Sequence, residues 1–224
     1  SSNSPSAGSQ RESAPIDQGG VKATLTNFII CFAKDTLIST NRGEVRVQDP
    51  RVGDRVVTRD NGFQEIRWIG SKRLTRTEVL VQPELRPIVV KAGSLSHGLP
   101  ERDLSLSPNH RLLLAGAEAN LLFGEPEVLA AAKYLVGMDG VTQSAPADVE
   151  YFHILFDHHE VILSNGAWTE SFQPGDYALD GLGKEQRQEI HVLFPELSEE
   201  GMPAPYASAR VVLKKHEALA FKQA

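Results

Sequence analysis

The chain has 224 residues, a formal net charge of −6 at pH 7 and 41% hydrophobic residues. This length and composition suit one soluble globular domain with a substantial core, or two at most. The lack of a basic block argues against a nucleic-acid surface, and no apolar run approaches the roughly 20 residues needed to span a bilayer.

The first thirty residues change character part of the way along. Residues 1–20 are rich in Ser, Pro, Gly and Gln, and this composition predicts a disordered linker. Residues 21–30 are apolar and β-prone, which predicts a strand that leads into Cys31. Such a strand would hold the peptide bond between Ile30 and Cys31 in place.

The next stretch alternates short β-prone segments with turns. Asn41-Arg42-Gly43 and Asp60-Asn61-Gly62 predict tight turns, because they contain residues that tolerate positive φ. So many short strands with frequent turns predict an all-β body. The predicted strands include residues 66–69, 79–81 and 87–90.

The second half continues this pattern and then becomes helical. Residues 92–104 are predicted as a loop, in which His97 is given no chemical role, and residues 137–147 as another. Residues 125–136 have helix-forming composition, with a proline near the start. Strands are predicted at 112–115, 149–156 and 160–163. Helical spacing at 184–192 and 207–221 predicts a mainly helical extension over residues 176–224.

Cys31 is the only cysteine, so it cannot form an intramolecular disulfide. A single buried cysteine usually serves as core packing. The alternative is a reactive thiol, for which the surrounding residues have to supply a reason.

Those surroundings form an ordered series of short motifs. They are Cys31-Phe32, Thr36-x-Ile38-x-Thr40, Gly53-Asp54-x-Val56, Arg67-Trp68-Ile69-Gly70, Ser107-Pro108-Asn109-His110, His159-Glu160-Val161 and Asn165-Gly166. In this order they resemble the Hint domain, the autoprocessing domain of hedgehog proteins and inteins, and most of all its bacterial intein-like branch. The resemblance implies a flattened, horseshoe-like β fold with pseudo-twofold halves over residues 21–175.

The resemblance also implies a reaction. Cys31 would attack the carbonyl of Ile30 in an N-to-S acyl shift, giving a thioester that water, a thiol or an amine resolves. The thiol must lose a proton and the amide nitrogen must gain one. In the family a histidine donates that proton, which corresponds to His110, and Ser107 would hydrogen-bond the scissile peptide. Without the resemblance, Ser107 and His110 would be interpreted as a serine in a turn or helix cap beside an ordinary histidine.

A second group of polar residues contains His153, Asp157, His158 and His159. Such a group raises the alternative of a zinc site. On an extended strand, however, His158 would face away from the other three, so we predict no metal and no cofactor. The resemblance makes His159 a support of the active site and Asp157 a group that orients an imidazole or acts as a base. His153 is the weaker candidate.

Two residues depart from the family pattern near Cys31. Asp35 replaces the usual glycine before Thr36, which Asp tolerates because it can adopt the left-handed conformation. Ile30 is β-branched and crowds its own carbonyl. Both departures favour slow or triggered cleavage.

A third departure concerns the other end of the domain. A splicing intein ends in His-Asn, but Glu170 and Ser171 stand at the corresponding positions. Serine has no carboxamide nitrogen with which to attack its own carbonyl, so cleavage at the second junction is not expected.

We therefore expect a self-cleaving domain whose substrate is its own amino-terminal flank, with a thiol or amine as possible acceptor and no nucleic-acid partner. One alternative is a Hint-like scaffold that has lost cleavage and serves a larger secreted or surface protein. Another is the zinc site at residues 153–159. The sequence leaves the compartment undecided, and only the family resemblance suggests a secreted or cell-surface setting in a bacterium.

Overall fold

The computed structural model describes residues 30–174, 184–185, 187–188 and 207–221. The predicted linker at 1–20, nearly all of the predicted strand at 21–30 and most of the helix predicted at 184–192 lie outside these residues. The domain boundaries near residues 20 and 175 therefore stay predictions.

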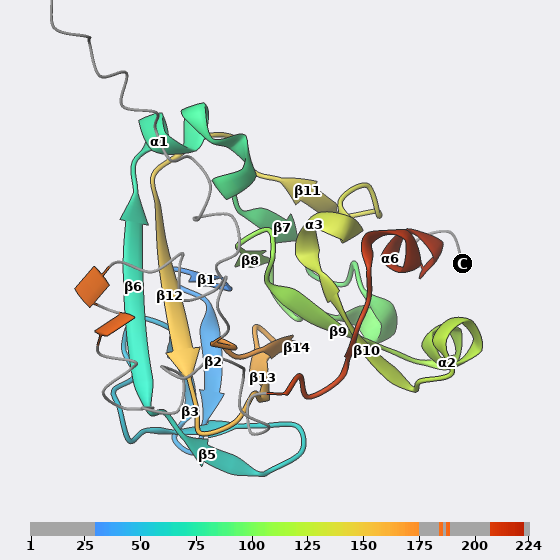
Figure 1. The fold of residues 1–224 in the computed structure, drawn as a ribbon, viewed down its shortest axis with the longest axis horizontal. Coiled ribbons are helices and arrows are strands. Elements are labelled where there is room, and N and C mark those ends of the chain that lie inside the picture. The colour runs from blue at the N-terminus through green and yellow to red at the C-terminus, as the bar shows by residue number, and fades with distance from the viewer. Residues whose placement is uncertain (1–29, 175–183, 186, 189–206, 222–224) are drawn as a thin grey trace, which may run out of the picture.

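The strands form two sheets (Figure 1). The first contains, in spatial order, β11 (Val141–Gln143), β7 (Ile88–Val90), β8 (Leu104–Leu106), β1 (Phe32–Ala33), β12 (Val149–Leu155) and β6 (Trp68–Leu74). The second contains β15 (Val211–Val212), β10 (Glu127–Ala131), β9 (Arg111–Ala115), β14 (Ala167–Glu170), β13 (Val161–Ser164), β2 (Leu37–Thr40), β4 (Arg55–Val57) and β5 (Phe63–Glu65), while β3 (Gly43–Arg46) pairs with β2. Within the described residues neither sheet closes into a barrel.

Few helices accompany the sheets. In the part of the chain that the structure describes they are α1 (Arg76–Val81), α2 (Ala117–Phe123), α3 (Ala132–Leu135) and α6 (Lys215–Phe221), with short 3₁₀ turns η2 (Pro83–Leu85) and η3 (Ser96–Gly98); residues 184–185 and 187–188 are helical as well. The predicted all-β class with a small helical appendage at the carboxyl end is therefore confirmed. None of the described helices is long and apolar enough to cross a membrane.

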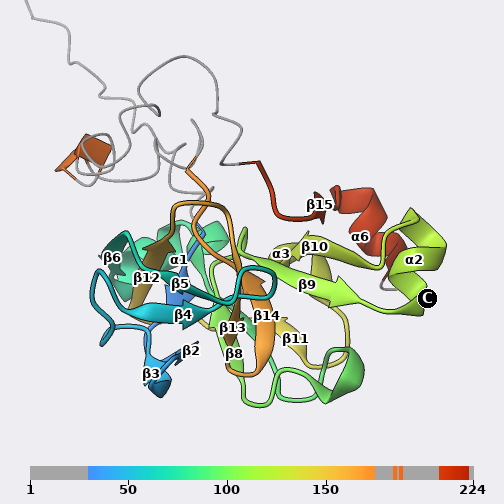
Figure 2. The same cartoon turned by 90° about the horizontal axis from the view of Figure 1, so that it is seen from below.

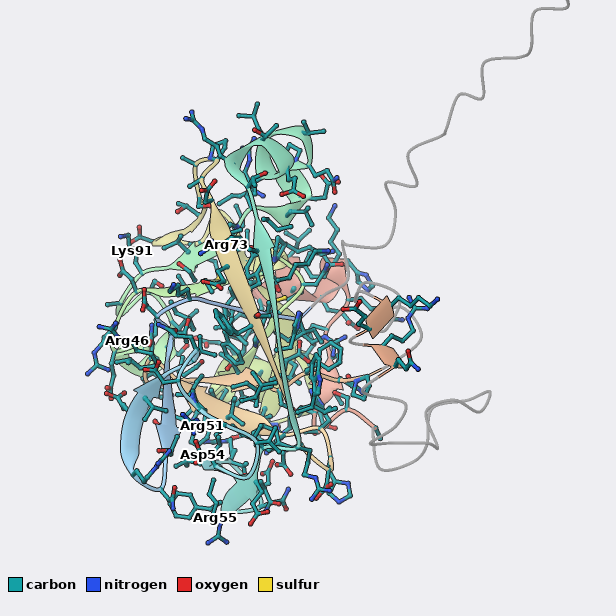
Figure 3. The ribbon with its side chains drawn as sticks, turned by 90° about the vertical axis from the view of Figure 1, so that its left-hand side faces the viewer. Arg46, Arg51, Asp54, Arg55, Arg73 and Lys91 are labelled. Atoms are coloured by element: carbon teal, nitrogen blue, oxygen red, sulfur yellow. The ribbon has the colours of Figure 1, made fainter. Side chains whose placement is uncertain are left out.

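Side chains from both sheets form one main core. Ile38, Leu106, Leu112 and Ile154 are fully buried in it, and Phe32 joins them directly after Cys31. Each such side chain stabilises the fold by about 1.5–3 kcal/mol relative to an exposed position. The arginines and the lysine labelled in Figure 3 lie on the outer surface. Phe32, the residue after Cys31, is therefore held in the main core.

Three turn predictions are confirmed by backbone angles. Gly43 and Gly62 have φ values of +100° and +65° in the two tight turns. Asp35 takes a φ of +68°, the left-handed conformation expected of it. The Asp35 backbone N–H donates to Gln48 Oε1 at 3.0 Å, and Gln48 Nε2 donates to the Asp35 carboxylate at 2.7 Å. This pair of hydrogen bonds offsets the cost of placing a non-glycine residue there.

The strand predicted at residues 79–81 is wrong, because these residues end helix α1. Thr75 and Glu78 form a capping box, in which the Thr75 hydroxyl accepts from the Glu78 N–H and the Glu78 carboxylate binds the Thr75 N–H at 2.7 Å. That Thr-x-x-Glu signal is visible in the sequence and outweighs the β propensity of the two valines.

The helix predicted at residues 125–136 is mostly wrong. Residues 127–131 form β10, which pairs with β9 on one side and β15 on the other, and only α3 is helical. Four of the five β10 residues are buried. Alanines suit this position because neighbouring side chains pack closely over them, and this tertiary burial overrides their helix propensity.

Further differences are smaller. The predicted loop at 137–147 contains β11, helix α2 was not predicted, and the predicted helix at 207–221 is β15 followed by α6. The strands predicted at 112–115, 149–156 and 160–163 are confirmed as β9, β12 and β13.

The carboxyl-terminal elements lie against the second half of the domain. β15 pairs in parallel with β10, and α6 packs against α2 and α3, as Figures 1 and 2 show. β10 and α3 in turn hold the 107–110 loop, because Ala132 N–H binds the His110 carbonyl and Lys133 N–H binds the Pro108 carbonyl, both at 2.9 Å. This loop carries two of the predicted site residues.

Candidate active site

The sheet brings Cys31 together with two residues that are distant in the sequence. β1 is antiparallel to β8 on one side and to β12 on the other. Their register places Cys31, just before β1, opposite Ser107 and His153. The backbone N–H of Ser107 binds the Cys31 carbonyl at 3.0 Å.

The peptide bond between Ile30 and Cys31 is held from both sides. Its N–H donates to Ser107 Oγ at 2.9 Å, and its carbonyl oxygen accepts from His153 Nδ1 at 2.9 Å. A donor at this carbonyl favours the charge that develops on oxygen during nucleophilic attack. The carbonyl end of the bond is therefore polarised in the direction that attack needs, while Ser107 fixes the orientation of its N–H.

His153 also borders the thiol. Cys31 Sγ lies 3.5 Å from Nδ1 and 3.7 Å from Nε2 of this ring. A carbonyl oxygen can only accept, so Nδ1 carries the proton and Nε2 is left as a base. Burial lowers the pKa of His153 to about 4, so the resting ring is neutral.

The thiol itself is deeply buried. Cys31 is only 2% exposed and packs with Val79 of α1, Leu85 of η2 and Tyr151, whose hydroxyl donates to the Leu85 carbonyl at 2.8 Å. Burial raises the pKa of the Cys31 thiol far above its ordinary value. Before reaction, the Cys31 thiol and the His153 imidazole are therefore both neutral. An energetically unfavourable transfer of the thiol proton to the imidazole must precede attack.

His110 lies on the other side of Ser107. Its ring Nε2 donates to the Glu170 carbonyl at 2.9 Å, and its Nδ1 is buried without a hydrogen bond among the described residues. The ring meets Phe32 edge-on, with centroids 4.4 Å apart. Burial lowers the pKa of His110, while the negative charge of Glu170 and the backbone of Cys31 oppose that effect. Nδ1 is therefore the nitrogen left to exchange a proton.

Beyond His110 lies a buried charged cluster. The Glu170 carboxylate accepts from Arg111 N–H at 2.8 Å, from Arg111 Nη1 at 3.0 Å and from His159 Nε2 at 3.2 Å. His159 Nδ1 accepts the Ala209 N–H at 3.0 Å, so the proton of this neutral ring is on Nε2. His159 thus touches Glu170 rather than the Cys31 peptide.

Asp157 does not reach the site. Its side chain is 56% exposed and lies 3.4 Å from Arg67 Nε. The assumed strand alternation fails because β12 ends at Leu155, after which the chain turns. The turn also separates His153 from His159. Among the residues that the structure describes, no three His, Cys, Asp or Glu side chains are grouped as metal ligands would be.

Sequence reasoning made His153 the weaker candidate, whereas the structure places its ring on the Ile30 carbonyl and beside the thiol. The signal that could have favoured His153 is the pairing of β1 with β12, which no single-sequence pattern contains. Glu170 was noticed only as a departure from the splicing pattern, because a lone glutamate gives no sign of being buried.

Several solved structures have a similar fold. The DnaB intein from Synechocystis has 11% identity and a TM-score of 0.41, covering 63% of this chain and 98% of that chain. The bacterial intein-like domain from Clostridium thermocellum has 12% identity and a TM-score of 0.40, covering 62% and 96%. The gp41-1 intein has 11% identity and a TM-score of 0.36, covering 62% and 97%. No curated protein sequence matches the chain.

The family is established by a sequence model rather than by these structures. A model of the Hint domain matches residues 30–176, which is more than half of the chain. The matched part includes Cys31, Ser107, His110 and Glu170. The family expected from the motifs is confirmed, and this chain belongs to the Hint domain family.

Proposed function

We propose that this chain is a self-cleaving domain that breaks the peptide bond between Ile30 and Cys31. The observation that carries the proposal is the setting of that bond, with Ser107 on its nitrogen, His153 on its oxygen and the Cys31 thiol beside it. Membership of the Hint family, whose domains act on their own flanking segments, supports the same conclusion.

In the first step the sulfur of Cys31 attacks the carbonyl carbon of Ile30, and the carbonyl electron pair moves to oxygen. His153 Nε2 can take the thiol proton, while Nδ1–H is directed at the oxyanion. The tetrahedral adduct then expels the Cys31 nitrogen, to which protonated His110 donates from Nδ1. Overall, His153 takes one proton from the thiol, His110 gives one proton to the amine, and a thioester replaces the amide; proton exchange with solvent then returns both rings to their starting forms.

In the second step water, a thiol or an amine attacks the thioester carbonyl. The segment that ends at Ile30 is released or transferred, and Cys31 regains its thiol as the new amino terminus. Because the site is buried under α1 and η2, we expect this step to be slow without a small nucleophile.

The reaction stops at this junction. Ser171, at the position where an intein has its terminal asparagine, is fully buried and is tied to Glu160 by two hydrogen bonds, of 2.8 and 3.0 Å. It has no amide nitrogen that could cyclise. We therefore expect cleavage on the amino-terminal side without joining of the flanks.

The test is intact mass after incubation of the full chain with dithiothreitol. We expect residues 1–30 to leave as a fragment of about 3.0 kDa, the mass that their sequence gives, or as its thiol adduct. Reporter domains fused to both ends should separate at the amino-terminal junction alone. Reporters joined to each other would contradict the proposal. Persistent full-length mass would favour the alternative of a scaffold without cleavage, which the buried, neutral thiol would then explain.

Replacement of His153 by alanine should slow thiol-induced cleavage by about 10²-fold, because it removes the donor to the Ile30 carbonyl. Cleavage is followed by mass spectrometry over time. His158→Ala is the matched control, since this exposed histidine lies five residues away in the same segment. Equal rates in the two variants would show that His153 has no part in the reaction.

A further inference from the structure

Glu170 is a charged residue that the mechanism above does not use. Its side chain is 0% exposed, yet it keeps an ionised carboxylate with three hydrogen bonds from Arg111 and His159. Burial of an unpaired carboxylate costs several kcal/mol, so a fully buried one needs such partners. These partners hold the Glu170 side chain in one place.

The same residue contacts the proton donor by its backbone. The Glu170 carbonyl accepts from His110 Nε2 at 2.9 Å, while its side chain binds the N–H of Arg111, the residue after His110. Strand β14 thereby holds both the ring of His110 and the start of β9. Because a carbonyl oxygen only accepts, Nε2 keeps its proton, and Nδ1 is the ring nitrogen left to gain or lose one.

We propose that Glu170 is a positioning residue for His110: its backbone carbonyl holds the ring through Nε2, and its buried carboxylate, bound to the backbone of the next residue, places a fixed negative charge beside this segment. This inference rests on the proposed role of His110 as proton donor. Burial lowers the pKa of a histidine that acts as proton donor, so less of it is protonated. A fixed negative charge nearby raises that pKa and increases the protonated fraction.

The groups around His110 agree with this role. Burial lowers the pKa of His110, and the charge of Glu170 is the largest opposing influence. The positive charge of Arg111, which lies on β9, lowers the pKa of His110. On β12, burial lowers the pKa of His153, and the nearness of His110 contributes. Cys31 is neutral, so among the residues that the structure describes Glu170 is the one anion that raises the pKa of His110.

The experiment measures the pKa of His110 by NMR on histidine-labelled protein in a Cys31→Ala background, where no cleavage can occur. Glu170→Gln is expected to lower the His110 pKa by about one unit, or to below the measurable range. Glu170→Asp keeps the charge and should stay within a few tenths of a unit of the parent. The matched control is Glu160→Gln, since Glu160 is also buried but binds Asn61.

In the protein that retains Cys31, Glu170→Gln should slow thiol-induced cleavage at pH 7 about tenfold, and Glu170→Asp should restore most of it. A merely structural role predicts the opposite order, because the shorter aspartate disturbs the packing more than glutamine does. An unchanged His110 pKa in Glu170→Gln, or equal losses in both variants, would overturn the inference. The NMR result stands even if the parent protein does not cleave, so the two proposals can fail separately.

Discussion

Replacement of Cys31 by alanine is expected to abolish thiol-induced cleavage altogether. Within the described part of the chain, the sulfur is the nucleophilic atom beside the Ile30 carbonyl, since Ser107 Oγ accepts from the Cys31 N–H instead. The substitution removes one buried atom, which should lower the free energy of unfolding by about 1 kcal/mol. Loss of reaction with an intact fold would therefore assign the nucleophile.

The measurement is intact mass over several days with and without dithiothreitol, alongside thermal unfolding. Cys31→Ser is the informative companion, because its hydroxyl can give an ester that hydroxylamine cleaves slowly. Cleavage that persists at the same bond in Cys31→Ala would exclude the acyl shift. It would leave hydrolysis by water, for which the buried site has no evident path.

Substitution of His110 by alanine should slow thioester formation by 10²- to 10⁴-fold, the usual effect of losing a general acid. Without a donor, the tetrahedral adduct returns to the amide rather than expelling the Cys31 nitrogen. The change also leaves the Glu170 carbonyl without its partner, at a cost of about 1–3 kcal/mol in stability. The rate must therefore be compared at a temperature well below the unfolding transition.

His97→Ala is the control for this variant, because His97 lies in the 92–104 loop outside the site. Single-turnover cleavage by dithiothreitol measures the rate, and circular dichroism checks the fold. An unchanged rate in His110→Ala would move the donor role to His153, the other imidazole at the scissile peptide. His159 is less suited, because it binds Glu170 and Ala209.

Much of the fold could be predicted from local patterns. Turn residues marked the tight turns at Gly43 and Gly62, and β-prone composition marked β12 and β13. The errors arose where local and tertiary preferences disagree. Helix α1 has valines that favour strands, but a capping box begins it. Strand β10 has alanines that favour helices, but neighbours on both sides bury it.

By itself, the sequence determined the family, the single cysteine and the Ser107–His110 loop, because these depend on residue type and spacing along a few neighbouring positions. Only the tertiary structure decided that His153 rather than Asp157 faces the thiol, and that Glu170 is a buried anion behind His110. Those facts follow from the pairing of β1 with β12 and from the contact of β14 with β9. Such contacts join residues more than fifty positions apart, and their register is set by the packing of the whole core rather than by any local pattern.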